Sequence, residues 1–410
     1  MKCLSCKSNQ LLSIYNFGKI PLVNSFSRNF RVSNKKYNLD LVVCKICKTC
    51  QLNKAPHGDV VFKNYKYFSR ASIDNVKHLE SVAGFIKKNF PNCVNILEIG
   101  CNDGTLMRLL CDKNFPNVVG IDPAVNMRKE KIHLKLKTIF KHFDHKVIDD
   151  LKIRSKNNSY DLIIGLNVFA HFPTVQPSFL NVSKLLSKNG FFFFEVAYAL
   201  KTVFSGLYDT VYHEHIFNHS LFSLKNMLSS ANLKITHASL INTQGGSLRV
   251  ICQRKESNLE LKIENEYDNI LRKEINLGLN KIFYYRSLAN KIRKSNKKIN
   301  ELIAKFIPNK NDPVILIGAP GRGVVIANTT NIKNYTKLLP LDDTKEKYGT
   351  FFPGTKCKVL TWSNLKKQKK PNIAILLCWN YRKTMLKKIR SIGFKGKILC
   401  FFPKLDIIKI

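Results

Sequence analysis

The segment Asp209-Thr-Val-Tyr-His-Glu-His215 is a dense polar cluster that combines acids, histidines and a tyrosine. Its last four residues, Tyr212, His213, Glu214 and His215, offer three kinds of proton acceptor. A histidine and a carboxylate that work near neutral pH are suited to removing a proton from a carbon next to a carbonyl group. His171, which follows another predicted strand, can join them from the carboxyl edge of the same sheet. The sequence therefore predicts an acid–base site around this segment.

Two other interpretations of the segment stay open. His213 and His215 are two residues apart, so on an extended chain both would face one way and could share a metal ion. The segment could also be a loop of surface histidines. Four ionisable groups next to a predicted cofactor pocket favour a functional site over such a loop.

The N-terminal segment carries two Cys-x-x-Cys pairs, Cys3/Cys6 and Cys44/Cys47. Zinc takes four thiolates in a tetrahedron, and two such pairs supply two ligands each. A segment this short has little core, so metal binding would stabilise its fold. We expect a structural site, because four thiolates leave no open position for chemistry. Cys50 offers a competing Cys47/Cys50 pair, and reduced thiols without a metal are the remaining alternative.

The scaffold for these groups is predicted by the stretch Asn95-Ile-Leu-Glu-Ile-Gly-Cys-Asn-Asp-Gly-Thr-Leu106. Its apolar run at 94–99 predicts a buried strand, and residues 105–111 predict the start of a helix. A strand, a glycine-rich turn and a helix are typical of the entry to a nucleotide-type α/β sheet. Gly100 and Gly104 allow a tight turn, and Asn102 is suited to a left-handed backbone.

The ligand of this turn is predicted from two acidic residues. Glu98, at the end of the first strand, suits a cationic or hydroxyl-bearing ligand better than a pyrophosphate. Asp122 ends a second predicted strand at 117–121, about 20 residues beyond the turn, where an acid accepts hydrogen bonds from ribose hydroxyls. The two acids favour S-adenosylmethionine (SAM) over a dinucleotide.

The rest of the chain alternates predicted strands and helices, which indicates parallel sheets. The further elements that we expect are strands at 160–167, 190–196, 314–317, 338–343, 373–378 and 397–402, a strand beginning after the glycines at 245–246, and a helix at 174–187. Residues 314–323 repeat the pattern of a strand, a glycine turn and a helix, which is weak evidence for a nucleotide or phosphate site.

We predict an α/β fold with a small zinc-binding N-terminal module and two Rossmann-like parallel-sheet domains. The predicted division is a zinc-binding module at 1–58, a SAM-dependent methyltransferase domain at 59–257, a charged helical connector at 258–306 and a C-terminal Rossmann-like domain at 307–410.

The composition restricts the partners. The chain has 410 residues and a formal net charge of +40, which usually points to nucleic acid or another anionic surface. The basic residues are spread almost evenly, however, so we interpret the charge as a diffuse, solvated surface and expect no specific nucleic-acid partner. The start of the chain lacks a secretory signal, and no apolar run approaches the roughly 18 residues of a membrane span. We expect a cytoplasmic monomer or weak dimer without a membrane partner.

Together these stretches resemble the nucleotide-sugar C-methyltransferases, which methylate a carbon next to a keto group in a deoxysugar. The matching stretches are Cys3/Cys6 with Pro21-Leu22-x-Asn24-x-Phe26, Cys44/Cys47 with Gln51-Leu52, Glu98-Ile-Gly-Cys-Asn-Asp-Gly-Thr, Asn167 with His171, Tyr212-His-Glu-His215, Gly245-Gly-Ser-Leu-Arg249, Gly318-Ala319, Asp343 with Lys347, Gly349, Pro353-Gly354 and Trp379-Asn380. The sequence departs from the family at Gln244, where a histidine is common, and at Arg322, where a lysine is common.

The resemblance implies the following residues for each role. Zinc would be held by Cys3, Cys6, Cys44 and Cys47, and SAM by Glu98, Gly100, Asn102, Gly104 and Asp122. His171, Tyr212, Glu214 and His215 would surround the sugar, with His215 as the general base. We expect substrate contacts from Tyr65, Tyr67, Asn167, Arg249 and Arg322, although the two tyrosines could equally form a lid or pack between domains.

These observations predict SAM-dependent methylation of the carbon next to the keto group of a nucleotide-linked keto-deoxysugar, by base-assisted enolate formation. One alternative is a zinc-containing, SAM-dependent RNA methyltransferase, which explains the charge but not an acid–base cluster beside the cofactor. The other is a non-enzymatic, zinc-bearing interaction protein with a decayed SAM fold. The intact glycine turn and ribose acid argue against that alternative.

Overall fold

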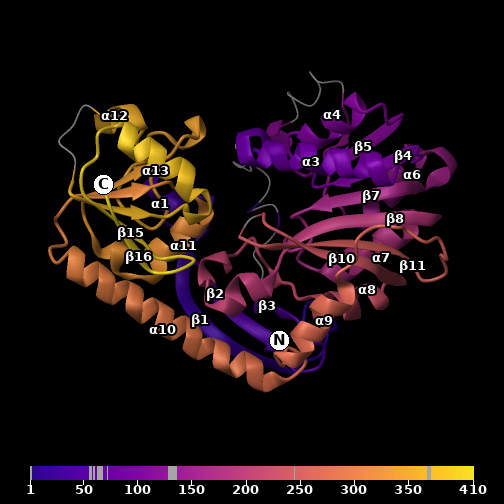
Figure 1. Cartoon of the computed structure of the whole chain (residues 1–410), viewed down its shortest axis with the longest axis horizontal. Helices are drawn as coiled ribbons and strands as arrows, with labels where there is room; N and C mark the ends of the chain where they lie inside the picture. Colours follow the sequence, from indigo (N-terminus) through magenta and orange to yellow (C-terminus); the bar gives the residue numbers. More distant parts are fainter. Residues whose placement is uncertain are drawn as a thin grey trace.

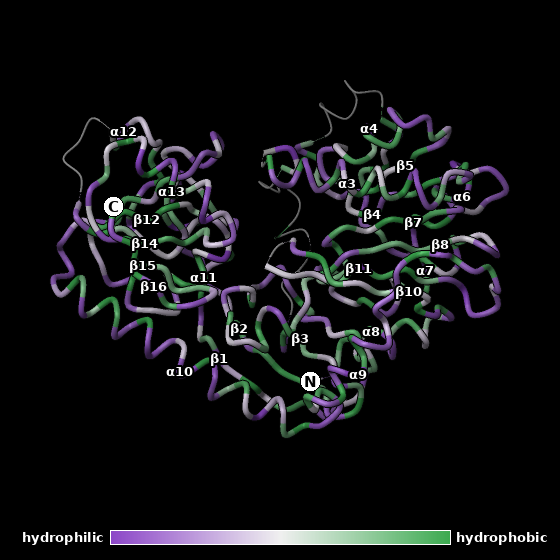
Figure 2. The backbone as a smooth tube through the Cα atoms, in the orientation of Figure 1, coloured by the Kyte–Doolittle hydropathy of each residue, from purple (hydrophilic) through white to green (hydrophobic). Residues whose placement is uncertain are grey.

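The computed structural model describes residues 2–54, 58, 61, 68–71, 73–127, 136–243, 245–366 and 371–410. Within these residues the chain forms three sheets, two of them in separate lobes and the third, from the N-terminal segment, below and between the lobes (Figure 1). The apolar segments lie mainly in the strands and inward helix faces, and the hydrophilic ones in loops and outer helix faces (Figure 2). None of the described helices has the length and apolar composition needed to span a bilayer.

The lobe formed by the predicted methyltransferase domain is called the methyltransferase lobe below. Its sheet has the strand order β10-β11-β8-β7-β4-β5-β6. Its parallel strands are β4 (Asn95–Ile99), β5 (Asn117–Ile121), β6 (Lys137–Ile139), β7 (Tyr160–Leu166) and β8 (Leu186–Ala197). Two antiparallel strands, β10 (Leu233–Ile241) and β11 (Ser247–Arg254), complete one edge. The strands predicted at 94–99, 117–121, 160–167 and 190–196 are confirmed as β4, β5, β7 and β8. The sheet is thus parallel in its centre and antiparallel at one edge.

Helices pack against both faces of this sheet. One face contributes to a core with α3 (Ile73–Asn89) and α4 (Thr105–Asp112). The other face packs with α6 (Ile148–Ile153), α7 (Val175–Leu185) and α8 (Leu221–Ser229). The central strands are therefore buried on both sides, which is why they read as continuous apolar runs in the sequence.

The sheet of the C-terminal lobe has the order β13-β12-β14-β15-β16. Its strands are β12 (Val314–Ile317), β13 (Leu338–Leu341), β14 (Ile373–Leu376), β15 (Lys397–Cys400) and the antiparallel β16 (Asp406–Lys409), and its helices are α11 (Gly321–Thr329), α12 (Trp362–Lys366) and α13 (Arg382–Ser391). The predicted connector is two helices, α9 (Tyr267–Asn276) and α10 (Ile282–Phe306), separated by a turn at Gly278. Helix α10 runs along the underside of the molecule toward the C-terminal lobe (Figure 1).

The N-terminal segment forms an antiparallel sheet that the sequence analysis did not predict. Its elements are β1 (Leu11–Pro21), α1 (Phe30–Ser33), β2 (Lys36–Cys44) and β3 (Cys50–Leu52), and its fourth strand is β9 (Phe217–Asn218) from the methyltransferase region. Its apolar face shares one core with α10 and the C-terminal lobe, for example through Phe26, Tyr285 and Phe352. The segment is therefore packed into the molecule on two sides. The division of the chain into domains stays a prediction.

Candidate active site and metal centre

A cavity of about 810 Å³ opens where the N-terminal sheet and the two lobes meet. Asn24 lines it from the N-terminal segment, Glu98 and Asp122 from the methyltransferase lobe, and Arg322 and Lys347 from the C-terminal lobe. This volume lies toward the upper end of the range of small-molecule sites in proteins. The position between lobes suits a large ligand, or two ligands together.

The turn after β4 has the backbone that its residue types require. The φ angles of Gly100, Asn102 and Gly104 are 71°, 47° and 81°, so the predicted left-handed asparagine is confirmed. A side chain at Gly100 would fall 2.7 Å from Cγ2 of Val168, which explains why glycine occupies this position. Gly100 and Asn102 line the cavity, whereas Gly104 caps the start of α4 and is not part of the lining.

Asp122 is fixed across this turn by two backbone hydrogen bonds. The Asn102 amide donates to Oδ2 and the Ala124 amide donates to Oδ1, each at 2.8 Å. A carboxylate oxygen can accept a second hydrogen bond, so the side chain is held in place with acceptor capacity left for a ligand. Glu98 is also buried and lines the same cavity. An acceptor-rich pocket of this kind fits the hydroxyls and positive charge of SAM.

The segment before α3 is tied to the same turn. The Ser69 amide donates to Oδ1 of Asn102 at 2.9 Å, and the Arg70 amide donates to Oδ2 of Asp103 at 3.0 Å. The residues just before α3 are therefore hydrogen-bonded to the turn after β4, which is called the cofactor turn below because SAM is predicted to bind there. Tyr65 and Tyr67, predicted to contact the substrate, lie outside the described residues.

Replacement of Asp122 by Ala is expected to weaken SAM binding about 10- to 100-fold, because hydrogen bonds to a charged acceptor are lost. Isothermal titration calorimetry with SAM measures this directly. Asp149→Ala, which removes an acid whose side chain is 93% exposed, is the matched control and should leave the affinity unchanged. An Asp122→Ala protein that binds SAM as tightly as the wild type would remove this residue from the site.

Tyr212 and His215 form a hydrogen-bonded pair at the cavity. The Tyr212 hydroxyl is 2.7 Å from Nε2 of His215, and Nδ1 of His215 is 3.0 Å from the Thr210 carbonyl oxygen. Because a carbonyl oxygen only accepts, Nδ1 carries the proton and Nε2 carries the lone pair. The Tyr212 hydroxyl therefore donates to Nε2. This arrangement makes Nε2 the basic atom of the imidazole.

His171 lies next to this pair. Its ring meets the His215 ring edge to face, with centroids 5.0 Å apart. Burial lowers the pKa of His171 to about 4, and burial together with the charges of His171 and Arg322 holds the pKa of His215 well below 6.5. Both imidazoles are thus neutral at neutral pH. A neutral His215 can accept a proton, as a general base requires.

Glu214 and His213 point to different partners. Nδ2 of Asn24 lies 2.7 and 2.9 Å from the two carboxylate oxygens of Glu214, which is 3% exposed. Nε2 of His213 lies 3.2 Å from the Tyr37 carbonyl oxygen, and the two rings are in contact. Because His213 and His215 have separate partners, the alternative of a metal shared between them is not supported.

Asp209 connects this segment to the C-terminal lobe. It is fully buried, and its Oδ2 accepts a hydrogen bond of 2.7 Å from Nε1 of Trp379. The Arg322 guanidinium stacks over the Trp379 ring at 5.4 Å, and a side chain at Gly245 would fall 2.9 Å from the same ring. The predicted substrate residue Arg322 therefore reaches the cavity from a second lobe. The sequence analysis did not assign Asp209, although it begins the polar segment.

Arg249, the other arginine predicted to contact substrate, has a different environment. Its guanidinium donates to Oε1 of the buried Glu195 at 2.8 and 2.9 Å and contacts the rings of both Phe85 and Phe193. It is not part of the cavity lining, whereas Asn167 is. Glu195 also contacts Nε2 of His78 at 2.6 Å, and His78 lines the cavity. The lone carboxylate in an apolar strand was the sequence signal for this buried network.

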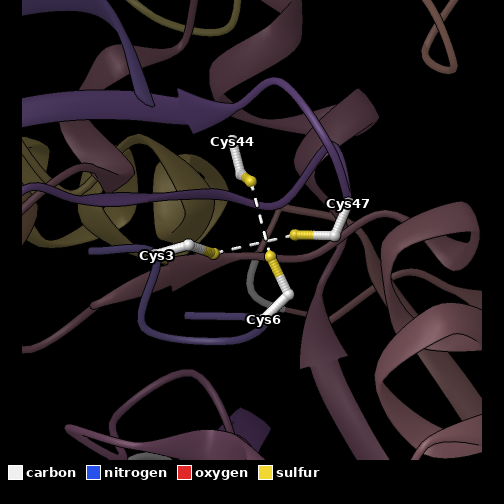
Figure 3. Close-up of side chains that lie close together, drawn as sticks. All are labelled: Cys3, Cys6, Cys44 and Cys47. Atoms are coloured by element: carbon white, nitrogen blue, oxygen red, sulfur yellow. Dashed lines mark hydrogen bonds between the residues drawn. The ribbon is translucent and has the colours of Figure 1, made fainter. Parts of the chain in front are cut away.

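The four predicted metal-binding cysteines come together (Figure 3). The Sγ atoms of Cys3, Cys6, Cys44 and Cys47 all lie within 4.8 Å of one another. Cys3 and Cys47 are 3.7 Å apart, and Cys6 and Cys44 are 3.6 Å apart. Zn–S bonds of about 2.3 Å in a tetrahedron require sulfurs about 3.8 Å apart.

The donor set therefore fits a structural zinc ion. Cys50 is buried in the core and does not belong to this group, so the alternative Cys47/Cys50 pair is wrong. In the described part of the chain, no other group of three or more His, Cys, Asp or Glu side chains is arranged to hold a metal.

Three family models match successive parts of the chain. A putative zinc binding domain matches residues 3–62, a methyltransferase domain matches 63–238, and a C-methyltransferase C-terminal domain matches 242–403.

Individual proteins resemble the chain over different lengths. The C-methyltransferase NovU of Streptomyces niveus is 26% identical over 385 residues, which covers 93% of this chain and 90% of that protein. A ubiquinone biosynthesis O-methyltransferase of Pelagibacter ubique is 31% identical over 124 residues, which are 30% of this chain and 49% of that protein. Among solved structures, an S-adenosylmethionine-dependent methyltransferase from Clostridium acetobutylicum has a TM-score of 0.35 and 17% identity, covering 45% of this chain and 94% of its own.

Proposed function

We propose that the chain methylates a nucleotide-linked keto-deoxysugar. It belongs to the C-methyltransferases that join a zinc-binding domain to a methyltransferase domain and a C-methyltransferase C-terminal domain. The carbon that receives the methyl group is the one next to the keto group. As a C-methyltransferase the chain uses SAM and carries structural zinc.

One observation carries the proposal: the turn with Asp122 and the Tyr212–His215 pair line the same cavity. A carbon is a poor nucleophile until a proton beside a carbonyl group is removed. Methylation of carbon therefore needs a base beside the cofactor, whereas a nucleic-acid nitrogen or oxygen would not require a keto–enol acid–base cluster. A neutral, half-buried imidazole with a fixed tautomer provides that base.

Proton removal is assigned to Nε2 of His215. Its Nδ1 proton is held by the Thr210 carbonyl, so the proton taken from the sugar stays at Nε2 and the imidazolium keeps its orientation. The Tyr212 hydroxyl lies 2.7 Å from Nε2, the atom that receives the proton. When substrate enters, this hydroxyl can turn from Nε2 to the enolate oxygen and stabilise its charge. His171 packs edge to face against the His215 ring and helps to hold its orientation.

When bound, SAM supplies the methyl group that the carbon nucleophile takes. The residues of the turn would contribute by orientation: Asp122, itself held by the Asn102 amide, would accept hydrogen bonds from the ribose hydroxyls, and Glu98 lines the same cavity. Holding two reactants in line lowers the barrier by avoiding the entropy cost of bringing them together.

The nucleotide half of the substrate is assigned to the C-terminal lobe. Arg322 sits in the first turn of α11, where the backbone amides also favour an anion. The Lys347 ammonium, held 2.9 Å from the Ala319 carbonyl oxygen and 3.1 Å from Asp342, lines the same part of the cavity. Lys388 adds a third cation to the lining. Lys347 and Lys388 are ion-paired with Asp342 and Asp343, and a diphosphate can bind to this group of cations from one lobe.

The test uses the purified chain with labelled SAM and a panel of nucleotide-linked keto-deoxysugars. We expect methylated sugar, and we expect deuterium exchange from solvent at the carbon beside the keto group without SAM. The same sugars with the keto group reduced to a hydroxyl are the matched control and should give neither product. Methyl transfer to RNA, at physiological salt and without any transfer to the sugars, would favour the RNA methyltransferase instead.

A further inference from the structure

The N-terminal segment holds the catalytic segment at three points. Asn24 donates to Glu214, the Tyr37 carbonyl contacts His213, and the Leu52 amide donates to the Ile216 carbonyl oxygen at 2.7 Å. Strand β3 also pairs with β9, directly after His215. Along the chain, two of these contacts lie between Tyr212 and His215, and the others follow His215.

The Asn24 contact is the one that reaches the cavity. Both Asn24 and Glu214 line it. A single amide nitrogen, Nδ2, lies 2.7 and 2.9 Å from the two carboxylate oxygens, so it fixes the plane of the carboxylate. Because the amide nitrogen only donates, it favours Glu214 as an ionised acceptor rather than a protonated donor.

We propose that Asn24 is a positioning residue of the active site, which orients the Glu214 carboxylate and makes the zinc-binding module part of the catalytic centre. The inference rests on the proposed function for the role of Glu214, while the contact itself can be tested without substrate. An oriented, ionised Glu214 accepts a hydrogen bond from a hydroxyl or other donor group of the sugar. It cannot stabilise the enolate oxygen, which also needs donors, so that task falls to Tyr212.

The zinc site supports this arrangement through the chain. The cysteine loop joins β2 to β3, and the backbone amide of Leu4, next to Cys3, donates to Oε1 of Gln51 at 3.0 Å. The neighbouring Leu52 then contacts Ile216. The module that carries zinc is therefore linked directly to the segment that carries the base, without passing through the cofactor turn.

The experiment compares Asn24→Ala with Asn38→Ala, which removes an exposed asparagine from the same sheet. Asn24→Ala should lower kcat for methyl transfer about 10- to 100-fold, the size expected for a hydrogen bond to a charged group. Its Kd for SAM should stay within about twofold of the wild type, because Asn24 hydrogen-bonds to Glu214, which belongs to a different segment from the turn after β4. Asn38→Ala should leave both quantities unchanged.

A double-mutant cycle with Glu214→Gln identifies the route of the effect. The Asn24→Ala/Glu214→Gln protein should be no slower than Glu214→Gln alone, because Asn24 acts through Glu214. Additive losses, or a normal kcat in Asn24→Ala, would overturn the inference. Asn24→Leu keeps nearly the size of the side chain and removes the donor, so it serves if Asn24→Ala does not fold, and it should lose about as much activity.

A substrate-free measurement separates this inference from the proposed function. The same cycle is carried out on the free energy of unfolding, where the two substitutions should be non-additive because the residues are in contact. If the changes in unfolding free energy are non-additive but the wild type does not turn over any keto-sugar, the contact between Asn24 and Glu214 is confirmed and the proposed function is wrong. Additive stability changes would overturn the contact itself.

Discussion

Replacement of His215 by Asn is expected to slow methyl transfer and solvent deuterium exchange together, each by about 10²- to 10⁴-fold, the usual contribution of a general base. Asn keeps a similar size but has no basic nitrogen. The exchange reaction is measured without SAM, so it reports removal of the sugar proton alone. A parallel loss in both reactions would identify proton removal as the step that His215 serves.

The pH dependence of the wild-type rate follows from the same group. The pKa of His215 is held well below 6.5, mainly by burial and then by the charges of His171 and Arg322. The imidazole is neutral above that pKa and becomes protonated as the pH falls through it, so exchange should be lost only on the acid side, below pH 6.5. An anionic substrate beside Arg322 would offset part of that charge and raise the basicity of His215.

Tyr212→Phe is the matched comparison for this prediction. The substitution removes the donor to the enolate oxygen but leaves Nε2 of His215 free to reach the substrate, so a weaker exchange should remain measurable. If His215→Asn retains normal exchange and loses only methyl transfer, the base lies elsewhere. His171 or Glu214 would then be the next candidate, and His215 would be assigned to positioning.

Features set by local sequence could be predicted well. The turn after β4 needs positive φ at Gly100, Asn102 and Gly104, and those residue types reveal it directly. Asp122 follows because an acid at the end of the next parallel strand always meets the same turn. The paired cysteines could be predicted for a similar reason, since each Cys-x-x-Cys knuckle is a local unit.

Features set by contacts between distant parts of the chain could not be predicted from the sequence. The N-terminal sheet was missed because β1 has irregular pairing and because β9, its fourth strand, comes from far along the chain. Arg249 is aligned with a buried carboxylate that belongs to another strand, and only the register of β8 and β11 reveals it. Asn24 belongs to the stretch Pro21-Leu22-x-Asn24-x-Phe26 of the family resemblance, yet nothing in the local sequence indicates that its partner is Glu214.

Removal of one zinc ligand, Cys6→Ser, is expected to abolish stoichiometric zinc binding and to destabilise the N-terminal module. Zinc sites of this kind contribute on the order of 10 kcal/mol of folding free energy in isolated peptides. The effect here should be smaller but still several kcal/mol, because the module also shares a core with the C-terminal lobe. Elemental analysis of protein purified without added metal, together with thermal unfolding, measures both quantities.

Cys111→Ser is the control, because Cys111 is an exposed thiol outside the cysteine group. It should keep one zinc atom per chain and the wild-type unfolding temperature. Hydrogen exchange adds a spatial test, since β9 depends on β3 for its pairing. In Cys6→Ser, protection should fall at Phe217–Asn218 while β4 and β5, which pair with each other inside the methyltransferase lobe, stay protected. A folded, active preparation without zinc would contradict the prediction, because the shared core alone would then be sufficient to hold the module and the catalytic segment in place.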